Sequence, residues 1–405
     1  MSFQQGLSGL NASSQNLDVI GHNIANANTT GMKASRAEFA ELYASSLGST
    51  GGVSKGLGVE VQTISQQFTQ GNISVTGNSL DVAINGNGFF QLQLTDGSTA
   101  YGRDGAFKLN KSGEIITNDG AHLLGLTAAA DGTIPTGGAV GPLTLPTGGE
   151  IPAVATSAVT LGFNLDAAAA VATGGPPPAA LVPVLQTYGT SITTYNAQGA
   201  EIPVSVYFTK TAANTWDVYA SVDGGAVTNQ GTLTDDVKGN PISPSLTSLT
   251  LPDAVGGTVT ATLDASASTQ YGSKFAVNTA TQDGQAPGTL TAITIDTSGI
   301  VQGTYSNGKS LAAGQIQLAT FTNVQGLAPI GSNFWRATPS SGDPSAKGVP
   351  GSGNLGSLRA GALEDSNVDL TKELVNMMTA QRAYQANAQT IKTQDQVMST
   401  LVNLR

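Results

Sequence analysis

Hydrophobic residues recur every three or four positions at both ends of the chain, which is the spacing of one face of an α-helix. Near the N-terminus this stripe is formed by Phe3, Leu7, Leu10, Ser14, Leu17, Gly21 and Ile24. Near the C-terminus it is formed by Leu370, Leu374, Met377, Gln381, Tyr384, Ala388, Ile391, Asp395, Met398 and Val402. The spacing predicts two long terminal helices that form a coiled-coil-like pair.

The C-terminal stretch is also hydrophobic along a second line, about 100° around the helix from the first. This line contains Val375, Met378, Val397, Leu401 and Leu404. One partner helix covers a single line, so we expect other copies of the chain to cover the remainder. Ser366 and Asp369 match a capping box, which predicts that the helix starts in this region.

Between the two helical patterns the hydrophobic period changes from 3.6 to 2, which is typical of β-strands. The segment FFQLQL, Phe89–Leu94, alternates, and the preceding NGNG, Asn85–Gly88, predicts a tight hairpin turn. The strands VSVYF, Val204–Phe208, and TWDVYASV, Thr215–Val222, are expected to pair with each other. Two Pro-rich and Gly-rich stretches, Ala128–Pro142 and Ala167–Pro183, predict loops or domain junctions.

These patterns predict a mainly β protein with nested middle domains between the terminal helices. The expected parts are a terminal helical domain of residues 1–25 plus 364–405, an extended linker of residues 26–71, an inner β domain of residues 72–144 plus 285–363, and an inserted outer β domain of residues 145–284. A length of 405 residues is sufficient for more than one such domain.

Composition and charge exclude several classes of function. A formal net charge of -10 removes the cationic surface that nucleic acid or an anionic membrane requires. Cysteine is absent, so there are no disulfides, thiolate metal sites or cysteine nucleophiles. The 51 glycines and the 11% of charged residues are instead typical of a β protein with many turns.

The segment GTYSNGKS, Gly303–Ser310, matches a phosphate-binding loop pattern. A phosphate loop must open a helix, whereas the next residues alternate as a strand does, so we interpret the segment as a turn. The histidines, His22 and His122, have no second histidine or cysteine near them in the sequence. We therefore expect no catalytic residue, no metal site and no cofactor.

Several segments carry a family resemblance. SGLNASSQNLDVIGHNIANANTTGMKASRAEF, Ser8–Phe39, resembles the N-terminal signature of the bacterial flagellar rod and hook proteins. The segments at Asn78–Leu92 and Tyr101–Ile115 are similar to β motifs of that family, and Leu363–Arg405 resembles its C-terminal helix. Length and the two-part middle of the chain favour a hook subunit within this family.

The resemblance implies a structural subunit that assembles with itself into a curved, flexible tubular polymer and acts as a universal joint. It implies terminal helices that line a central channel, with interface residues Phe3, Leu7, Leu10, Leu17, Ile24, Leu370, Leu374, Met377, Met378, Tyr384, Ile391, Met398, Leu401 and Leu404. Asn26, Asn28 and Gly31 would end the first helix and act as hinges before the linker.

The resemblance also implies partners and a location. The partners are other copies of the chain, the distal rod protein, the hook cap protein and the hook-filament junction protein. The flagellar type III apparatus would export the chain to the extracellular flagellum without a cleaved signal peptide. This agrees with the first basic residue being Lys33, since a signal peptide needs a basic residue before its apolar region.

Two alternatives differ from the hook subunit. A distal rod or other flagellar axial subunit would share the terminal motifs, but the inserted domain from about Leu145 to Asp283 argues against it. A surface adhesin or a carbohydrate-active β protein agrees with the composition. That class does not explain the heptad patterns at both ends.

Overall fold

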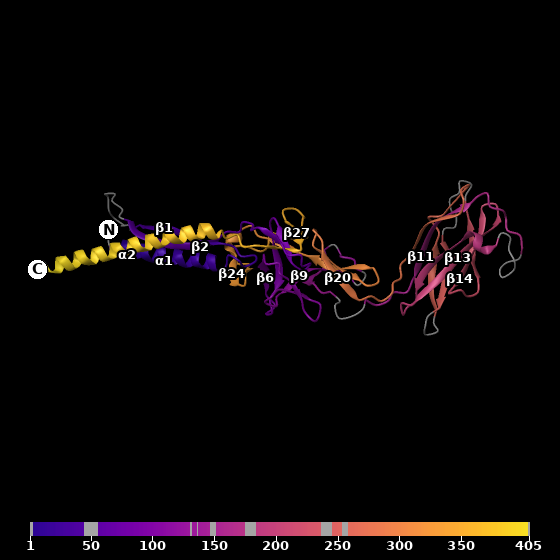
Figure 1. The fold of residues 1–405 in the computed structure, drawn as a ribbon, viewed down its shortest axis with the longest axis horizontal. Helices are drawn as coiled ribbons and strands as arrows, with labels where there is room; N and C mark the ends of the chain where they lie inside the picture. The colour runs from indigo at the N-terminus through magenta and orange to yellow at the C-terminus, as the bar shows by residue number, and fades with distance from the viewer. Residues whose placement is uncertain are drawn as a thin grey trace. The chain divides into compact units, whose positions relative to one another are not determined.

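The computed structural model describes residues 3–43, 56–129, 132–135, 137–145, 151–174, 184–235, 245–252 and 258–403. Within these ranges the protein is mainly β, with an α-helix near each end (Figure 1). The chain divides into two compact units. The first comprises residues 1–148, 292–304 and 310–405, and the second comprises residues 149–291 and 305–309. Among the described helices, none is long and apolar enough to cross a membrane.

The first unit contains the two long helices and a β-hairpin beside them (Figure 1). The elements are α1 (Phe3–Ala25), α2 (Leu370–Asn403), β1 (Ser35–Tyr43) and β2 (Gly56–Gln66).

The start of α2 differs from the predicted capping box, because the cap is Asp369. Its Oδ1 accepts hydrogen bonds from the backbone N–H groups of Thr371 at 2.9 Å and Lys372 at 3.1 Å. Ser366 caps nothing in the helix, and its Oγ accepts from Val368 N at 3.3 Å.

The predicted linker of residues 26–71 is extended, but it is not a free connection. Its described residues include β1 and β2, which pair antiparallel from Ser35 opposite Gln66 to Tyr43 opposite Gly56. The end of β2 is fastened to the β domain, since Trp335 Nε1 donates to Gln66 Oε1 and Phe68 packs against Trp335. Alternating Leu57, Val59 and Val61 favour a strand here, and pairing satisfies their backbone groups.

The β domain of the first unit is built on one large sheet. Its described strands follow the order β20-β21-β22-β9-β5-β6-β25-β24, with β10 and β8 on β9, β7 on β8, β23 on β5, and β26 on β23. The bounds are β5 (Phe89–Gln93), β6 (Thr99–Gly102), β7 (Lys108–Leu109), β8 (Ile115–Ile116), β9 (His122–Thr127), β10 (Val140–Pro142), β20 (Leu290–Ile295), β21 (Ile300–Tyr305), β22 (Ser310–Ile316), β23 (Leu318–Thr320), β24 (Ala328–Gly331), β25 (Phe334–Arg336) and β26 (Ala346–Gly348), with the 3-10 turn η2 (Val324–Gly326). Phe90, Leu92, Leu123 and Leu318 lie in its buried core.

Two short strand pairs complete this domain. They are β4 (Val82–Asn85) with β27 (Ser357–Ala360) and β3 (Ile73–Val75) with β28 (Ala362–Glu364). The prediction of a tight hairpin at Asn85–Gly88 is therefore wrong, because β4 pairs with β27 and β5 pairs with β6 and β9. The loop instead meets the C-terminal part of the chain, where Gly356 N donates to Asn87 O at 2.7 Å.

The second unit is a sandwich of two sheets. One has the order β16-β17-β11-β18 with β19 beside β11, and the other has the order β12-β13-β14-β15. The bounds are β11 (Ala158–Asp166), β12 (Gly189–Tyr195), β13 (Glu201–Ala212), β14 (Thr215–Val222), β15 (Thr228–Thr234), β16 (Ser245–Pro252), β17 (Thr258–Asp264), β18 (Thr269–Tyr271) and β19 (Ala276–Gln282), with the 3-10 turn η1 (Leu185–Tyr188). Phe163 from one sheet meets Phe208 from the other at 4.2 Å between ring centroids, which identifies the core.

Two sequence predictions concern this unit. The predicted pairing of Val204–Phe208 with Thr215–Val222 is confirmed, because β13 and β14 pair antiparallel from Val204 opposite Val222. The predicted bounds of the inserted domain, 145–284, differ from the second unit, whose main segment spans 149–291. The return segment extends further because it forms bridges to the outgoing one, Ile151 to Gly288 and Val154 to Gln285.

Candidate assembly surface

The helices α1 and α2 pack antiparallel through small residues of α1. A Cβ atom added at Gly6 would lie 3.1 Å from Ile391 Cγ1, and one added at Gly9 would lie 2.9 Å from Asn387 Nδ2. Asn387 Nδ2 also donates to Ser13 Oγ at 3.4 Å. Glycine and serine at these positions let the two helices approach closely and contribute little hydrophobic area themselves.

The N-terminal residues predicted as interface are not among the buried residues of α1. The residues that α1 buries are Gly6, Ala12, Val19, Ile20 and Asn23. In the predicted stripe, Phe3 and Leu7 are exposed and Leu10, Leu17 and Ile24 are partly exposed. On the α2 side, the predicted interface residue Ile391 does meet α1 at Gly6, and the pairing of the two stripes stays a prediction.

The C-terminal residues predicted as interface are mostly uncovered. Exposed fractions between 37% and 55% apply to Leu370, Leu374, Met378, Tyr384 and Met398, while Met377 and Ile391 are partly buried. Leu401 is placed only as a residue of α2, and Leu404 lies outside the described residues. Exposed apolar side chains grouped in this way on a helix are typical of an interaction surface.

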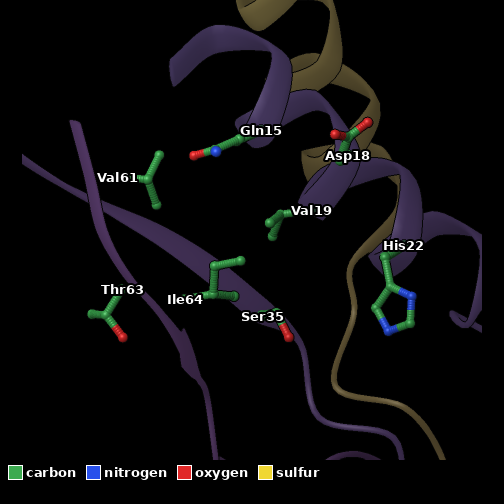
Figure 2. A pocket seen from close by; sticks show the side chains of 8 residues that line it. All are labelled: Gln15, Asp18, Val19, His22, Ser35, Val61, Thr63 and Ile64. Carbon is green, nitrogen blue, oxygen red and sulfur yellow. The ribbon is translucent and has the colours of Figure 1, made fainter. Parts of the chain in front are cut away.

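The hairpin of β1 and β2 forms one wall of a groove against α1. Asn23 holds it in place, since its Nδ2 donates to Ser35 O at 2.7 Å and its Oδ1 accepts from Ser35 N at 2.9 Å. Figure 2 shows Val19 of α1 and Val61 and Ile64 of β2 around one hollow of about 620 Å³. The rim is polar and is formed by Gln15, Asp18, His22, Ser35 and Thr63.

A buried charge cluster, Lys33, Arg103 and Glu364, joins the segment after α1 to the β domain. Lys33 Nζ donates to Glu364 Oε1 at 2.6 Å and to Thr69 O at 2.8 Å. Arg103 Nη1 donates to Glu364 Oε2 at 3.2 Å. The side chains of Lys33 and Glu364 are fully buried and that of Arg103 is nearly so. The cluster therefore ties three distant parts of the sequence together.

The electrostatics of the cluster are unbalanced, because two cations share one carboxylate. Burial lowers the pKa of Lys33, and the charge and hydrogen bond of Glu364 partly oppose this shift. Burial likewise lowers the pKa of Arg103. Arg103 is further stabilised by a cation–π contact with Phe89, in which its Cζ lies 5.3 Å from the ring centroid. Removing Glu364 would leave two buried positive charges without a counter-ion.

The predicted hinge residues lie between α1 and this cluster. Asn26 ends the helix, with its Nδ2 donating to His22 O at 2.9 Å, and Asn28 is exposed. Gly31 is buried at a φ of +68°, and its N–H donates to Glu364 O at 2.8 Å. A Cβ at Gly31 would lie 2.5 Å from Asp104 N, so the backbone leaves no room for a side chain there. Asn26, Asn28 and Gly31 remain predicted hinges.

Other candidate chemistry finds no support in the described residues. His22 Nδ1 lies 3.3 Å from Asn26 Nδ2, and His122 Nδ1 lies 3.8 Å from Glu114 Oε2. No group of three or more potential metal ligands occurs among the residues that the structure describes. The phosphate-loop pattern at Gly303–Ser310 is an antiparallel hairpin in which Thr304 pairs with Ser310, so no helix N-terminus faces a phosphate there.

Sequence reasoning missed the charge cluster and the groove. Arg103 and Glu364 each stand beside an aspartate, Asp104 and Asp365, so no local charge pattern marked them or Lys33 as buried partners. The partner itself was not predictable, because Lys33 and Glu364 are 331 positions apart. The alternation that ends at Val61 could have indicated the strand that lines the groove.

Four family models match this chain. They are the flagella basal body rod protein at residues 3–33, the flagellar hook protein FlgE/F/G D1 domain at 83–160, the flagellar basal body protein FlaE D2 domain at 164–285, and the flagellar basal body rod FlgEFG protein C-terminal at 359–404. The first and last of these fall on the two terminal helices and the junction beside them.

Full-length relatives give the same result. The flagellar hook protein FlgE of Escherichia coli (strain K12) is 42% identical over 416 residues, with 100% of both chains covered. That of Brucella suis biovar 1 (strain 1330) is 32% identical over 408 residues, with 100% of this chain and 98% of the relative covered. The crystal structure of Helicobacter pylori flagellar hook protein FlgE2 shares the fold, with a TM-score of 0.55 over 72% of this chain and 100% of that chain, at 16% identity.

Proposed function

Because the chain belongs to the flagellar hook protein FlgE family, we propose that it is a structural subunit of the bacterial flagellar hook and assembles with copies of itself into a tubular polymer. The observation that carries this proposal is the exposed apolar surface on both terminal helices. Phe3 and Leu7 of α1 and Leu374, Met378 and Met398 of α2 remain uncovered when α1 and α2 pack together. Neighbouring copies would bury these residues and provide the cohesion of the polymer.

The same proposal includes a coiled-coil-like arrangement of the helices inside the polymer. The small residues Gly6 and Gly9 set the contact within one chain, so the predicted stripes would meet stripes of other copies. A helix with apolar residues on more than one side suits such a bundle, since each side faces a different neighbour. The terminal helices would then form an inner tube.

The β domain of the first unit and the β sandwich of the second unit would form the outer part of this polymer and allow it to bend. Each unit has its own hydrophobic core, which supports rigid-body movement of one against the other as the polymer curves. A hook subunit with this property would act as a universal joint. The expected partners besides other copies are the distal rod protein, the hook cap protein and the hook-filament junction protein.

We further propose export by the flagellar type III apparatus without a cleaved signal peptide, and location in the extracellular hook. The family is structural, so we expect neither catalytic activity nor a cofactor. The full-length relatives carry the name of the hook protein over both units, which favours the hook over a distal rod subunit.

Electron microscopy of the purified chain under polymerising conditions tests the proposed function. We expect curved tubes. Straight tubes would support a rod subunit instead, and persistent monomers with sugar binding would favour the adhesin or carbohydrate-active class. Sedimentation of the same sample gives the concentration above which polymer forms, and that value is the reference for the variants described below.

A further inference from the structure

Close to both ends of its main segment, the second unit forms a narrow two-stranded ribbon. It consists of residues 151–154 and 285–288 and is named here the entry ribbon. Ile151 N donates to Gly288 O at 2.8 Å, and Gly288 N donates back to Ile151 O at 3.3 Å. Val154 N donates to Gln285 O at 3.0 Å, and Gln285 N donates back to Val154 O at 2.9 Å. Two bridges of this kind close the ribbon.

The entry ribbon has little of the burial that stabilises the sandwich. Val154 is 45% exposed, and Pro152 and Pro287 are exposed as well. The described hydrophobic core of the sandwich contains none of the ribbon residues. Segments with few buried apolar contacts open locally at a lower free energy than core strands do. We therefore expect the ribbon to open more often than the sandwich.

One asparagine side chain holds the entry ribbon from outside. It belongs to the turn of residues 305–309, at the end of the β21–β22 hairpin, which falls in the second unit together with the ribbon. Asn307 Nδ2 donates to Ala286 O at 2.7 Å, at a position between the two bridges. A Cβ added at Gly288 would lie 2.9 Å from Asn307 Nδ2, so the Asn307 amide also packs against the ribbon backbone.

The turn fixes the orientation of this asparagine. Asn307 Oδ1 accepts a hydrogen bond from Lys309 N at 3.1 Å, which leaves Nδ2 directed at the ribbon. Next to it, Ser306 N donates to Thr289 O at 2.9 Å, and Ser306 Oγ accepts from Thr289 N at 3.1 Å. The segment whose spacing matched a phosphate-binding loop thus binds the polypeptide that follows the ribbon.

From these contacts we infer that the entry ribbon is a conformational joint that opens before the sandwich core, and that Asn307 keeps it closed. Opening breaks the backbone bonds of both bridges and turns two paired segments into single chains, while the sandwich stays folded. The connection of the second unit then becomes more flexible. The inference goes beyond the proposed function and holds for one chain, whether or not that chain polymerises.

Amide hydrogen exchange tests the joint. NMR on the full chain, below the concentration at which polymer forms, follows the ribbon amides of Ile151, Val154, Gln285 and Gly288. The hydrogen-bonded amides of β13 and β14 serve as the reference for the sandwich core. We expect the ribbon amides to be protected at least about tenfold less than the reference amides, because local opening is easier than opening of the core.

The variant Asn307→Asp tests the role of the side chain. Aspartate keeps the oxygen that accepts from Lys309 N but cannot donate to Ala286 O. We expect exchange of the ribbon amides to become about three- to tenfold faster, as for the loss of one hydrogen bond, with the reference amides unchanged. The matched control is Asn229→Asp, since Asn229 is exposed on β15 and its Oδ1 likewise accepts from the second residue onward, Gly231 N at 2.8 Å.

Three results would overturn the inference. Ribbon amides as protected as those of β13 and β14 in the unsubstituted chain would show that the ribbon does not open first. An effect of Asn307→Asp no larger than that of the control would show that Asn307 does not keep the ribbon closed. Equal acceleration of ribbon and reference amides would mean that Asn307 stabilises the whole unit. The polymerisation assay tests the proposed function separately, because none of these results depends on polymer.

Discussion

The buried junction and the terminal helices of the same unit use opposite chemistry. At the junction, Lys33, Arg103 and Glu364 are charged, buried and paired within one chain. On the helices, Leu374 and Met378 are apolar and exposed. A buried charge must be paired when the chain folds, because an unpaired buried charge is costly. An exposed apolar side chain can be buried later, by a neighbouring molecule. The difference separates the part that is complete in a monomer from the part that is complete only after assembly.

The largest effect on the junction is expected from Glu364→Gln. This substitution leaves Lys33 and Arg103 buried without a counter-ion, and breaking a buried ion pair in this way costs about 3–5 kcal/mol of unfolding free energy. Denaturant unfolding followed by circular dichroism measures the loss. The matched control is Glu38→Gln, which removes the exposed pair with Arg36 and should reduce stability far less. Equal stability of both variants would contradict the role of the cluster.

A second substitution at the junction, Gly31→Ala, should be smaller in effect. The φ of +68° is unfavourable for alanine, and its Cβ would meet Asp104 N at 2.5 Å, so we expect a loss of about 2 kcal/mol. Gly97→Ala is the control, because it shares a positive φ of +82° without a close neighbour. If Gly31→Ala costs no more than the control, the close packing at Gly31 has no energetic weight.

On the helices, Met378→Asp should leave the monomer stable and impair assembly. Met378 is 53% exposed, so the unfolding curve should be unchanged. If the side chain is buried between copies, replacing it with a charge should raise the critical concentration about tenfold or more. Sedimentation of polymer measures this value. Val75→Asp on β3 is an exposed control that should assemble normally. Normal assembly of Met378→Asp would argue against α2 as the main interface.

The smallest effect concerns pH. Burial raises the pKa of Asp104 above 3.8, although hydrogen bonds from Ala106 N and Thr30 Oγ1 oppose the shift. The folded state then binds a proton more readily than the unfolded state, so the contribution of Asp104 to stability grows as the pH falls through this window. Relative to Asp104→Asn, the unsubstituted chain should gain stability on acidification. Denaturant unfolding at a series of pH values checks the sign.

An exposed carboxylate provides the opposite sign as a comparison. Hydrogen bonds from Arg36 and Ser65 lower the pKa of Glu38 below 4.5. Its contribution is therefore present above 4.5 and is lost as the pH falls through the folded-state pKa. Relative to Glu38→Gln, the unsubstituted chain should lose stability on acidification. The same sign at both positions would mean that burial does not control the titration of Asp104.

Hydrophobic spacing predicted the elements better than it predicted their contacts. The heptad pattern indicated both helices, but the surface of α1 that meets α2 uses Gly6, Gly9 and Ser13, which no hydrophobic pattern marks. Period-2 alternation predicted the β13–β14 pair because the two strands are adjacent in sequence. It could not predict that β4 pairs with β27, since a local pattern contains no information on a partner far along the chain.

For the candidate assembly surface too, the sequence predicted exposed residues better than it predicted contacts between elements. Exposure of Phe3, Leu374 and Met398 agrees with what the surplus of apolar residues predicted about a single copy, although which neighbour covers each residue stays a prediction. The groove was missed because Val61 and Ile64 lie within residues 26–71, which were predicted to be an extended linker. Its walls come from α1 and β2, and only their packing brings these side chains around one hollow.

The bond between Lys33 and Glu364 has a consequence for how the protein reaches its folded state. A polypeptide that emerges from a narrow pore beginning at its amino end presents Lys33 early and Glu364 331 positions later. Until Glu364 is present, Lys33 has no anion to neutralise it, and β3 lacks its partner strand β28. The fold of the first unit can therefore close only once the segment that carries Glu364 has joined it.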